Sequence, residues 1–97
     1  MIELYELRQF AAFAGCGTLS DAAKLLHLSQ PALSRNMKKL EEELGVKLFQ
    51  RSNHSVYLTD EGMIFRRRAQ ELVNLAEKAQ EELTQKEETL DRKSVRV

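Results

Sequence analysis

Polar side chains gather near the start of a short predicted helix in the segment TLSDAAKLLHLSQPALSR, which spans residues 18–35. Gln30, Ser34 and Arg35 supply an amide, a hydroxyl and a guanidinium group there. Glutamine can pair with adenine, and arginine with guanine, through two hydrogen bonds each. Two short helices joined by a tight turn, with such side chains early in the second helix, are typical of a helix-turn-helix that enters the major groove of DNA. The segment therefore predicts sequence-specific DNA binding.

Two helices are predicted before the helix that carries these polar side chains, which is the third along the chain. The first helix is expected over residues 4–15, where apolar residues recur at spacings of three and four. These residues are Leu4, Leu7, Phe10, Ala11 and Ala14. Gly15 and Gly17 are expected to end it, since glycine readily adopts the left-handed conformation that follows a helix. Ser20 is expected to cap the next helix, with Asp21 in its first turn. The packing residues expected in that helix are Ala22, Ala23, Leu25 and Leu26.

The third helix carries the polar side chains and is predicted to run from a Ser29 cap to a stop at Gly45. Pro31 fits its first turn, where the missing N–H costs no helical hydrogen bond. At 3.6 residues per turn, Arg35 points about 200° and Lys38 about 140° away from Leu33, with Ser34 at the border. One side of the helix is thus expected to be buried and the other to be free. The expected buried stripe is Leu33, Met37, Leu40 and Leu44.

Residues 46–58 predict a β-hairpin, because two short β-rich runs flank a polar loop at residues 52–55. Beside a helix-turn-helix, such a hairpin is a wing. Thr59 is then expected to cap a further helix, with Asp60 and Glu61 in its first turn. The predicted fold is mainly α: a winged helix-turn-helix of three helices and a two-stranded wing, followed by a long linker helix.

The long helix is predicted to reach about residue 91, because residues 63–97 contain neither proline nor glycine. At 1.5 Å per residue it would be about 48 Å long. Apolar residues recur in it at alternating steps of four and three, interrupted only by a lysine, which is a heptad seam. The small winged helix-turn-helix domain cannot bury so long an apolar stripe, so the seam predicts a homodimer. Its residues are Phe65, Ala69, Leu72, Ala76, Ala79, Leu83, Lys86 and Leu90.

Composition fits one small helix-rich domain with an appendage: 97 residues, 42% hydrophobic and 31% charged. The formal net charge is zero, whereas DNA-binding domains are often strongly basic. Residues 1–70 hold ten Lys and Arg against eight Asp and Glu, and residues 71–97 hold five against seven. Affinity for DNA must then come from a few well-placed cations. No apolar run is long enough for a membrane span, and the single cysteine, Cys16, is expected to be a small buried side chain in a cytoplasmic protein.

Four sequence runs resemble the DNA-binding domain of LysR-type transcriptional regulators. They are L-x-x-F-x-A-x-A-x-x-G from Leu7, A-A-x-x-L-x-x-S-Q-P-A-L-S-R from Ala22, L-E-x-x-L-G-V-x-L-F-x-R from Leu40 and L-T-x-x-G from Leu58. The resemblance covers residues 2 to about 90. It implies a winged helix-turn-helix domain over residues 1–59 and a linker helix over residues 60–91 that pairs antiparallel in a dimer. It also implies that residues 92–97 begin an effector-binding domain that is missing from this chain.

The resemblance implies roles for individual positions. The residues implied to contact bases are Gln30, Pro31, Ser34 and Arg35. The residues expected to contact or position the DNA backbone are Thr18, Ser20, Lys24, Ser29, Lys38 and Arg51. At the wing tip, Asn53 is followed by His54, where the family usually has an arginine. Histidine is largely neutral at pH 7, so this wing is less suited than an arginine wing to a narrow minor groove.

Other charged residues have more than one interpretation. Lys38 and Lys39 can contact phosphate, or they can pair with the glutamates four residues later. The acidic run at residues 41–43 and the basic run at residues 66–68 are expected to be solvated faces. No metal site is expected, because no His, Cys or Asp is spaced to complete a ligand set. His27 is expected to cover the turn before the third helix.

Among possible functions, the sequence favours the DNA-binding domain of a homodimeric bacterial transcriptional regulator. It predicts no cofactor in this fragment, and it assigns any small-molecule effector to the missing domain. A winged-helix module that binds another protein is the main alternative, and the near-zero net charge is its best support. An enzyme is not supported by any residue set, since no nucleophile triad or glycine-rich phosphate loop is present.

Overall fold

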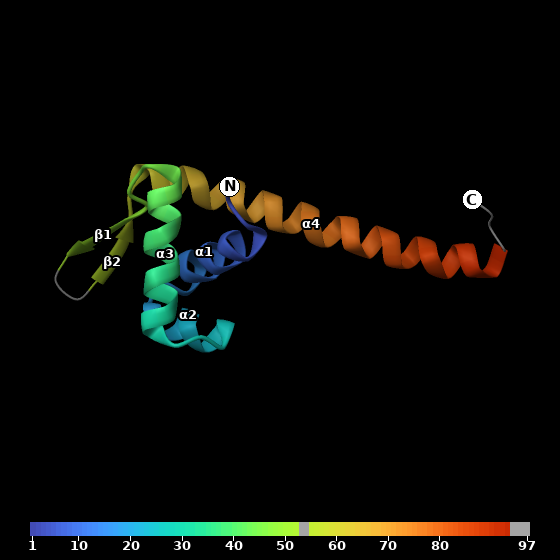
Figure 1. The fold of residues 1–97 in the computed structure, drawn as a ribbon, viewed down its shortest axis with the longest axis horizontal. Helices are drawn as coiled ribbons and strands as arrows, with labels where there is room; N and C mark the ends of the chain where they lie inside the picture. The colour runs from blue at the N-terminus through green and yellow to red at the C-terminus, as the bar shows by residue number, and fades with distance from the viewer. Residues whose placement is uncertain (53–54, 94–97) are drawn as a thin grey trace.

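The computed structural model describes residues 1–52 and 55–93. Its elements in chain order are α1 (Leu4–Cys16), α2 (Leu19–Leu26), α3 (Gln30–Leu44), β1 (Phe49–Ser52), β2 (Ser55–Leu58) and α4 (Asp60–Lys93). The strands form an antiparallel hairpin in which Phe49 pairs with Leu58 and Arg51 with Val56. The first three helices and the hairpin form a head, and α4 runs out of it as a rod, so the molecule measures 61 × 26 × 18 Å (Figure 1). The predicted winged helix-turn-helix with a long following helix is confirmed.

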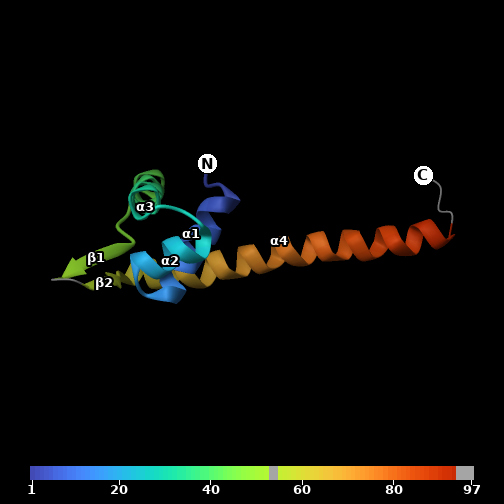
Figure 2. The same cartoon turned by 90° about the horizontal axis from the view of Figure 1, so that it is seen from below.

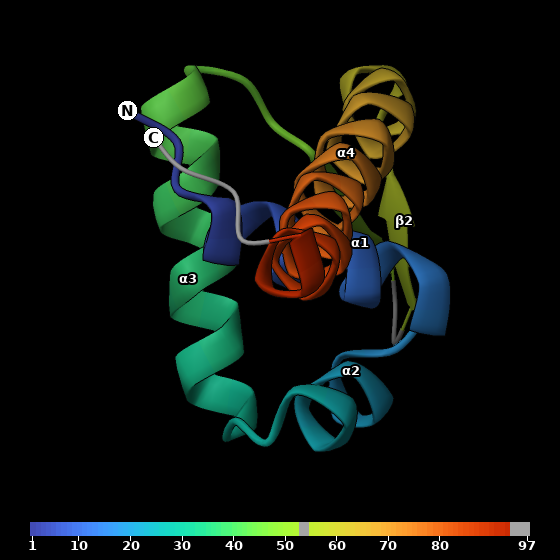
Figure 3. The ribbon, with the colours of Figure 1, turned by 90° about the vertical axis from the view of Figure 1, so that its right-hand side faces the viewer.

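Helix α1 is the centre of the head. It packs against α2, α3 and α4, and the view along α4 shows it starting near α3 and crossing behind α4 (Figure 3). Seen from below, the head gathers around the first turns of α4 and leaves the rest of that helix uncovered (Figure 2). The buried apolar core consists of Leu7, Phe10, Phe13, Ala22, Ala23, Leu33, Met37, Leu40, Leu48, Ala69 and Val73.

Four phenylalanines connect α1 to the wing and to α4. The ring centroid of Phe10 lies 5.4 Å from that of Phe49 and 5.1 Å from that of Phe65, both in tilted pairs. Phe13 stacks on Phe49 at 4.6 Å. Such aromatic pairs contribute about 0.5–1.5 kcal/mol each beyond the area they bury. The wing and the linker helix are therefore anchored on the same side chains.

The buried stripes of α1 and α2 differ from the predictions at Leu4, Phe13 and Leu25. Leu4 lies in the first turn of α1, at the edge of the head, and is 40% exposed, whereas the unpredicted Phe13 is buried. Leu25 of α2 is 63% exposed. Successive helical residues point about 100° apart, so Leu26 takes the inward direction and Leu25 does not. Cys16 is half-buried against the core, close to the expectation.

A carboxylate that the sequence analysis did not single out is buried at the start of α1. Glu6 is only 1% exposed, and its Oε1 accepts a hydrogen bond of 2.8 Å from the backbone N–H of Glu3. Glu3 and Glu6 form a reciprocal capping box, which satisfies N–H groups that a helix start leaves without partners. The other oxygen, Oε2, is buried without a hydrogen-bond partner in the described structure.

Two glycines stop helices as expected, and one does not. Gly17 follows α1 with φ of 80°, and Gly45 follows α3 with φ of 72°, both in the left-handed region. Gly15, which was also expected to end α1, lies inside that helix. The stop after α1 therefore depends on Gly17 alone.

Helix α4 begins inside the head and leaves it after about four turns. Ala69 and Val73 are buried and Phe65 and Ala76 are half-buried, whereas Leu72 and Leu83 are 48% and 65% exposed. Ala69 is buried in the core and Phe65 packs against it, so the head covers these two residues of the predicted seam, and Ala76 is partly covered. The dimer itself stays a prediction. The side chains of the last seam positions, Lys86 and Leu90, lie outside the described residues.

The end of α4 also shifts a predicted boundary. The helix continues to Lys93, two residues beyond its expected end near residue 91. Residues 94–97, part of the segment expected to begin an effector-binding domain, lie outside the described residues. Close to the head, the Arg8 guanidinium lies 3.8 Å from the Glu77 carboxylate and adds an exposed ion pair between α1 and α4.

The start of α4 is tied to the base of the hairpin. Thr59 Oγ1 accepts a hydrogen bond of 3.0 Å from the Gly62 N–H, which confirms the predicted cap, and donates one of 2.6 Å to the Lys47 carbonyl. The Thr59 N–H donates to the Leu48 carbonyl at 3.0 Å. Gly62 packs so closely on this carbonyl that a Cβ on residue 62 would overlap it.

We predict that Gly62→Ala lowers the free energy of unfolding by about 1–3 kcal/mol, the usual cost of overpacking a closely packed site. The matched control is Gly15→Ala, because a Cβ at residue 15 meets nothing within 4 Å. Alanine is favoured over glycine inside a helix by about 0.5–1 kcal/mol, so the control is expected to stabilise the protein. Urea unfolding followed by circular dichroism measures both. Equal effects of the two substitutions would contradict the close contact at residue 62.

Candidate nucleic-acid interface

Helix α3 buries one side and leaves the other side free, as its sequence predicted. Leu33 and Leu40 are fully buried and Met37 is 3% exposed, whereas Gln30, Pro31 and Arg35 are exposed and Ser34 is half-buried. The buried stripe fixes the rotation of the helix about its axis. Rotation in turn decides which side chains face outward, so packing on α1 and α2 presents Gln30, Pro31, Ser34 and Arg35 together.

The starts of α2 and α3 are capped by hydroxyl groups. Thr18 Oγ1 accepts a hydrogen bond of 3.1 Å from the Asp21 N–H, and Ser29 Oγ accepts one of 3.2 Å from the Ala32 N–H. The Ser29 cap and the position of Pro31 in the first turn are confirmed. The prediction that Ser20 caps α2 is wrong, because α2 begins at Leu19 and Ser20 lies within it.

The turn between α2 and α3 depends on one left-handed residue. His27 follows α2 with φ of 58°, and the next residue, Leu28, donates its N–H to the Ala23 carbonyl at 2.9 Å. The His27 side chain is exposed. The turn thus holds α3 close to the end of α2, as a helix-turn-helix requires.

A hydrogen bond that was not predicted ties the middle of α3 to α1. The side-chain amide of Asn36 donates to Gln9 Oε1 at 2.9 Å. Both residues are half-buried, so the bond is partly protected from water. Neither residue carries a sequence signal for this pairing, because the two positions are 27 residues apart.

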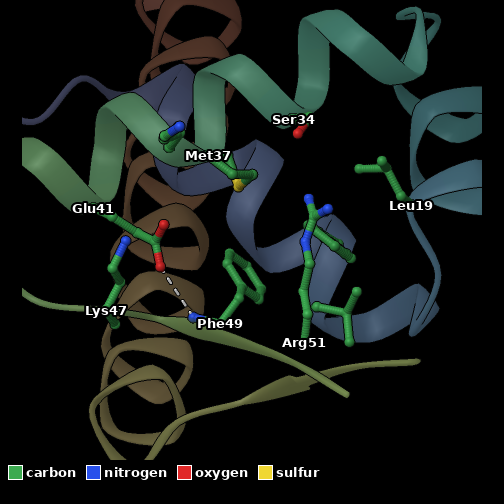
Figure 4. A pocket seen from close by; sticks show the side chains of 10 residues that line it. Leu19, Ser34, Met37, Glu41, Lys47, Phe49 and Arg51 are labelled. Carbon is green, nitrogen blue, oxygen red and sulfur yellow. Dashed lines mark hydrogen bonds between the residues drawn. The ribbon is translucent and has the colours of Figure 1, made fainter. Parts of the chain in front are cut away.

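A cleft of about 480 Å³ separates α3 from the hairpin. Its floor is apolar, with Phe13, Met37 and Phe49, and its rim carries Ser34, Lys38, Lys47 and Arg51. In Figure 4 the guanidinium of Arg51 reaches from β1 toward Ser34 on α3 and Leu19 on α2. The structure therefore brings three sequence-predicted residues from two elements, Ser34, Lys38 and Arg51, to one surface.

A second hollow adjoins this cleft at the beginning of α3. It is lined by Leu19, Gln30, Pro31, Ser34 and Arg51. Arg51, expected only to touch the DNA backbone, thus lies beside three of the four residues expected to contact bases.

The remaining predicted DNA contacts are placed separately. Thr18, Ser20 and Lys24 lie in or next to α2, and none of them lines either hollow. Lys24 is exposed, so it remains free to meet a phosphate. Asn53 and His54, the predicted wing tip, lie outside the described residues.

Glu41 corrects the prediction that residues 41–43 form a solvated face. Its Oε2 accepts hydrogen bonds from two backbone N–H groups, that of Leu48 at 2.7 Å and that of Phe49 at 3.1 Å. The side chain is half-buried, whereas Glu42 and Glu43 are exposed as predicted. The chain reverses after Gly45, at the end of α3, and so brings residues 48 and 49 back beside this helix. The glycine stop is the only feature of the sequence that hints at the contact of Glu41 with these two residues.

Among the described residues, the cations of this surface are not paired with acids. The ion pairs are Arg8 with Glu77, and Arg68 with Glu71 at 3.1 Å. Arg35, Lys38 and Arg51 take part in neither. Arg66 and Arg67 are exposed, as expected for a solvated basic run, and Arg68 uses a partner on its own helix.

The described residues include no group of three or more His, Cys, Asp or Glu placed to hold a metal ion.

Within the described chain, no helix is sufficiently long and apolar to span a membrane.

Comparison with known proteins gives the same family by sequence and by structure. Residues 4–63 match the family of bacterial regulatory helix-turn-helix proteins of the lysR type. The HTH-type transcriptional regulator BsdA of Bacillus subtilis (strain 168) is 43% identical over 79 residues, or 80% of this chain. The crystal structure of the CbnR_DBD–DNA complex is similar with a TM-score of 0.80 and 37% identity, covering 86% of this chain and 95% of that chain. The BenM_DBD/catB site 1 DNA complex is similar with a TM-score of 0.83 and 34% identity, covering 87% of this chain and 93% of that chain.

The chain belongs to the LysR family of regulatory helix-turn-helix proteins. It has the winged helix-turn-helix and long following helix of the DNA-binding domains in that family. It spans only 27% of the length of BsdA.

We predict that Thr18→Ala lowers the free energy of unfolding by about 1 kcal/mol, the usual cost of losing a helix cap. Ser20→Ala is the control, because residue 20 lies inside α2 and alanine favours a helix interior. Thermal and urea unfolding of the two variants measures the difference. A larger loss for Ser20→Ala than for Thr18→Ala would show that α2 begins later than the structure places it.

Proposed function

We propose that this chain is the DNA-binding domain of a bacterial LysR-type transcriptional regulator and binds a dyad-symmetric site on double-stranded DNA. Helix α3 enters the major groove and places Gln30, Pro31, Ser34 and Arg35 against base edges. The outward face of α3 carries the proposal, because its polar side chains remain uncovered in a fold that the CbnR and BenM domains use in their DNA complexes.

Phosphate contacts in this proposal surround the recognition helix. Lys38 and Arg51 flank the cleft beside α3, and Lys24 extends from α2. In this proposal the starts of α2 and α3, capped by Thr18 and Ser29, lie close to the DNA backbone, together with Ser20 in the first turn of α2. A handful of such contacts makes binding strongly dependent on salt, because each neutralised phosphate releases counterions.

The proposed dimer uses the exposed stripe of α4 and not the full seam expected from the sequence. The stripe consists of Ile64, Leu72, Leu75, Ala79 and Leu83, and its leucines and isoleucine are 48–68% exposed. These residues fall within an arc of about 100° around the helix. Pairing of this stripe with a second copy would place two heads on one site, with the half-site spacing set by the dimer.

The proposed role is regulatory and not enzymatic, in keeping with relatives that are transcriptional regulators. We place the protein in the cytoplasm and assign no cofactor to this part of the chain. A small-molecule effector, if the full-length protein uses one, would bind outside the domain described above.

We predict that Arg35→Ala lowers the affinity for a selected duplex by roughly 1–3 kcal/mol and relaxes preference at one base position. Lys24→Ala is expected to weaken all sequences alike, because a lysine–phosphate contact does not read the base. Selection of duplexes from a random library supplies the cognate site, and fluorescence anisotropy on cognate and scrambled duplexes gives the two losses. Equal losses for Arg35→Ala on both duplexes would contradict base contact.

Salt dependence separates this function from a winged-helix module that docks on protein. The affinity of the wild-type domain for duplex is expected to fall steeply with salt concentration, and Lys24→Ala is expected to reduce the slope by about one. Weak duplex binding without a preferred sequence and without a steep salt dependence would favour the protein-binding alternative.

We predict that Leu72→Lys with Leu83→Lys makes the protein monomeric and weakens its binding to a two-half-site duplex, because four buried charges would face one another in the dimer. The control is Asn74→Lys with Glu81→Gln, which changes the net charge by the same +2 on the opposite side of α4. Sedimentation equilibrium measures the mass of each variant. An unchanged mass of the double-lysine variant would refute the proposed stripe.

A further inference from the structure

We infer that Glu41 is a positioning residue that holds the wing in register with the recognition helix, so that Arg51 and α3 contact DNA together. The inference rests on the proposed function. Glu41 has no direct contact with DNA in this account, and it acts through the base of the hairpin.

The two hydrogen bonds of Glu41 lie immediately before Arg51. One carboxylate oxygen, Oε2, accepts both the Leu48 N–H at 2.7 Å and the Phe49 N–H at 3.1 Å (Figure 4 shows the second). Phe49 is the first residue of β1, and Arg51 is the third. A strand is stiff over two residues, so a shift at Phe49 moves the Arg51 guanidinium relative to Ser34 on α3.

The opposite edge of the same segment is held by α4. The carbonyl groups of Lys47 and Leu48 accept hydrogen bonds from the hydroxyl and the N–H of Thr59. Among the described residues, the hydrogen bonds between α3 and the hairpin segment all end on Glu41. Without Glu41 the hairpin would keep its link to α4 and lose its polar link to α3.

Charge alone predicts the opposite effect of removing Glu41. A carboxylate beside a surface that binds phosphate repels DNA, so its neutralisation is expected to strengthen binding. Glu42 and Glu43 share the same turn of α3, are exposed, and make no such backbone bonds. Loss of the positioning role would therefore lower the affinity for DNA, whereas loss of the charge alone would raise it. Comparing Glu41 with Glu42 or Glu43 on the same turn of α3 distinguishes the two effects.

Two conservative variants distinguish the effect of the length of the Glu41 side chain from the effect of its charge. Glu41→Gln removes the charge but keeps a carbonyl oxygen that can accept both N–H bonds, whereas Glu41→Asp keeps the charge and withdraws it by one methylene group. Positioning predicts that Glu41→Gln retains most of the affinity for a selected duplex and that Glu41→Asp and Glu41→Ala bind about tenfold more weakly, or 1.4 kcal/mol. Glu42→Ala, the control, is expected to bind equally well or slightly more tightly.

Hydroxyl-radical footprinting of the wild-type domain first defines the flanking DNA that the wing protects. Each variant is then titrated with a long duplex that contains this flank and with a short duplex that contains only the bases selected by α3. The losses for Glu41→Asp and Glu41→Ala are expected on the long duplex only, with base preference unchanged. In an Arg51→Ala background, Glu41→Ala should cause little further loss, because Glu41 acts through that arginine. Thermal unfolding confirms that titrations are made below the melting temperature, and Glu41→Asp replaces Glu41→Ala if the latter does not fold.

Three results would overturn the inference: Glu41→Asp binding as tightly as wild type, Glu41→Ala matching Glu42→Ala, or the losses of Glu41→Ala and Arg51→Ala adding in full. Failure of the proposed function is a different outcome. In that case the wild-type domain itself would show no preferred duplex, and no variant would be needed to see it.

Discussion

Phe10 is completely buried in α1, and its ring lies against Phe49 at the base of the wing and Phe65 in the linker helix. One side chain thus contacts both elements that extend from the head. Leu33 and Leu40 of α3 are buried in the same core. The relative placement of the recognition helix, the wing and α4 is therefore set by apolar packing around α1, before any nucleic acid is present. The aromatic core sets where the wing lies as a whole, and the polar bonds of Thr59 and Glu41 fix the register of its base within that placement.

Features with local causes could be predicted from the sequence. The Ser29 cap, Pro31 in the first turn and the stop at Gly45 each depend on neighbouring residues, so α3 and its free face followed correctly. The hairpin and the Thr59 cap followed for the same reason. The choice between Thr18 and Ser20 as the cap of α2 did not, because both hydroxyl residues precede the same apolar run and only the backbone conformation at Thr18 distinguishes them.

Features that depend on a distant partner could not be predicted. The carboxylate of Glu41 resembles those of Glu42 and Glu43 in the sequence, and only the reversal of the chain after Gly45 brings two N–H groups to it. The heptad pattern of α4 likewise does not say which of its apolar residues the head will cover. Phe65 and Ala69 fit the seam as well as Leu72 and Leu83 do, yet α1 packs against the first pair and leaves the second pair exposed.

The zero net charge, which argued against DNA binding, loses its force once the charges are located. The seven acids of residues 71–97 all fall within α4, mostly on the part of that helix beyond the head. Arg35, Lys38 and Arg51 form no ion pair among the described residues and surround the free face of α3. Screening at physiological salt acts over about 8 Å, so phosphates at this face respond to these nearby cations and little to the acids along the rod.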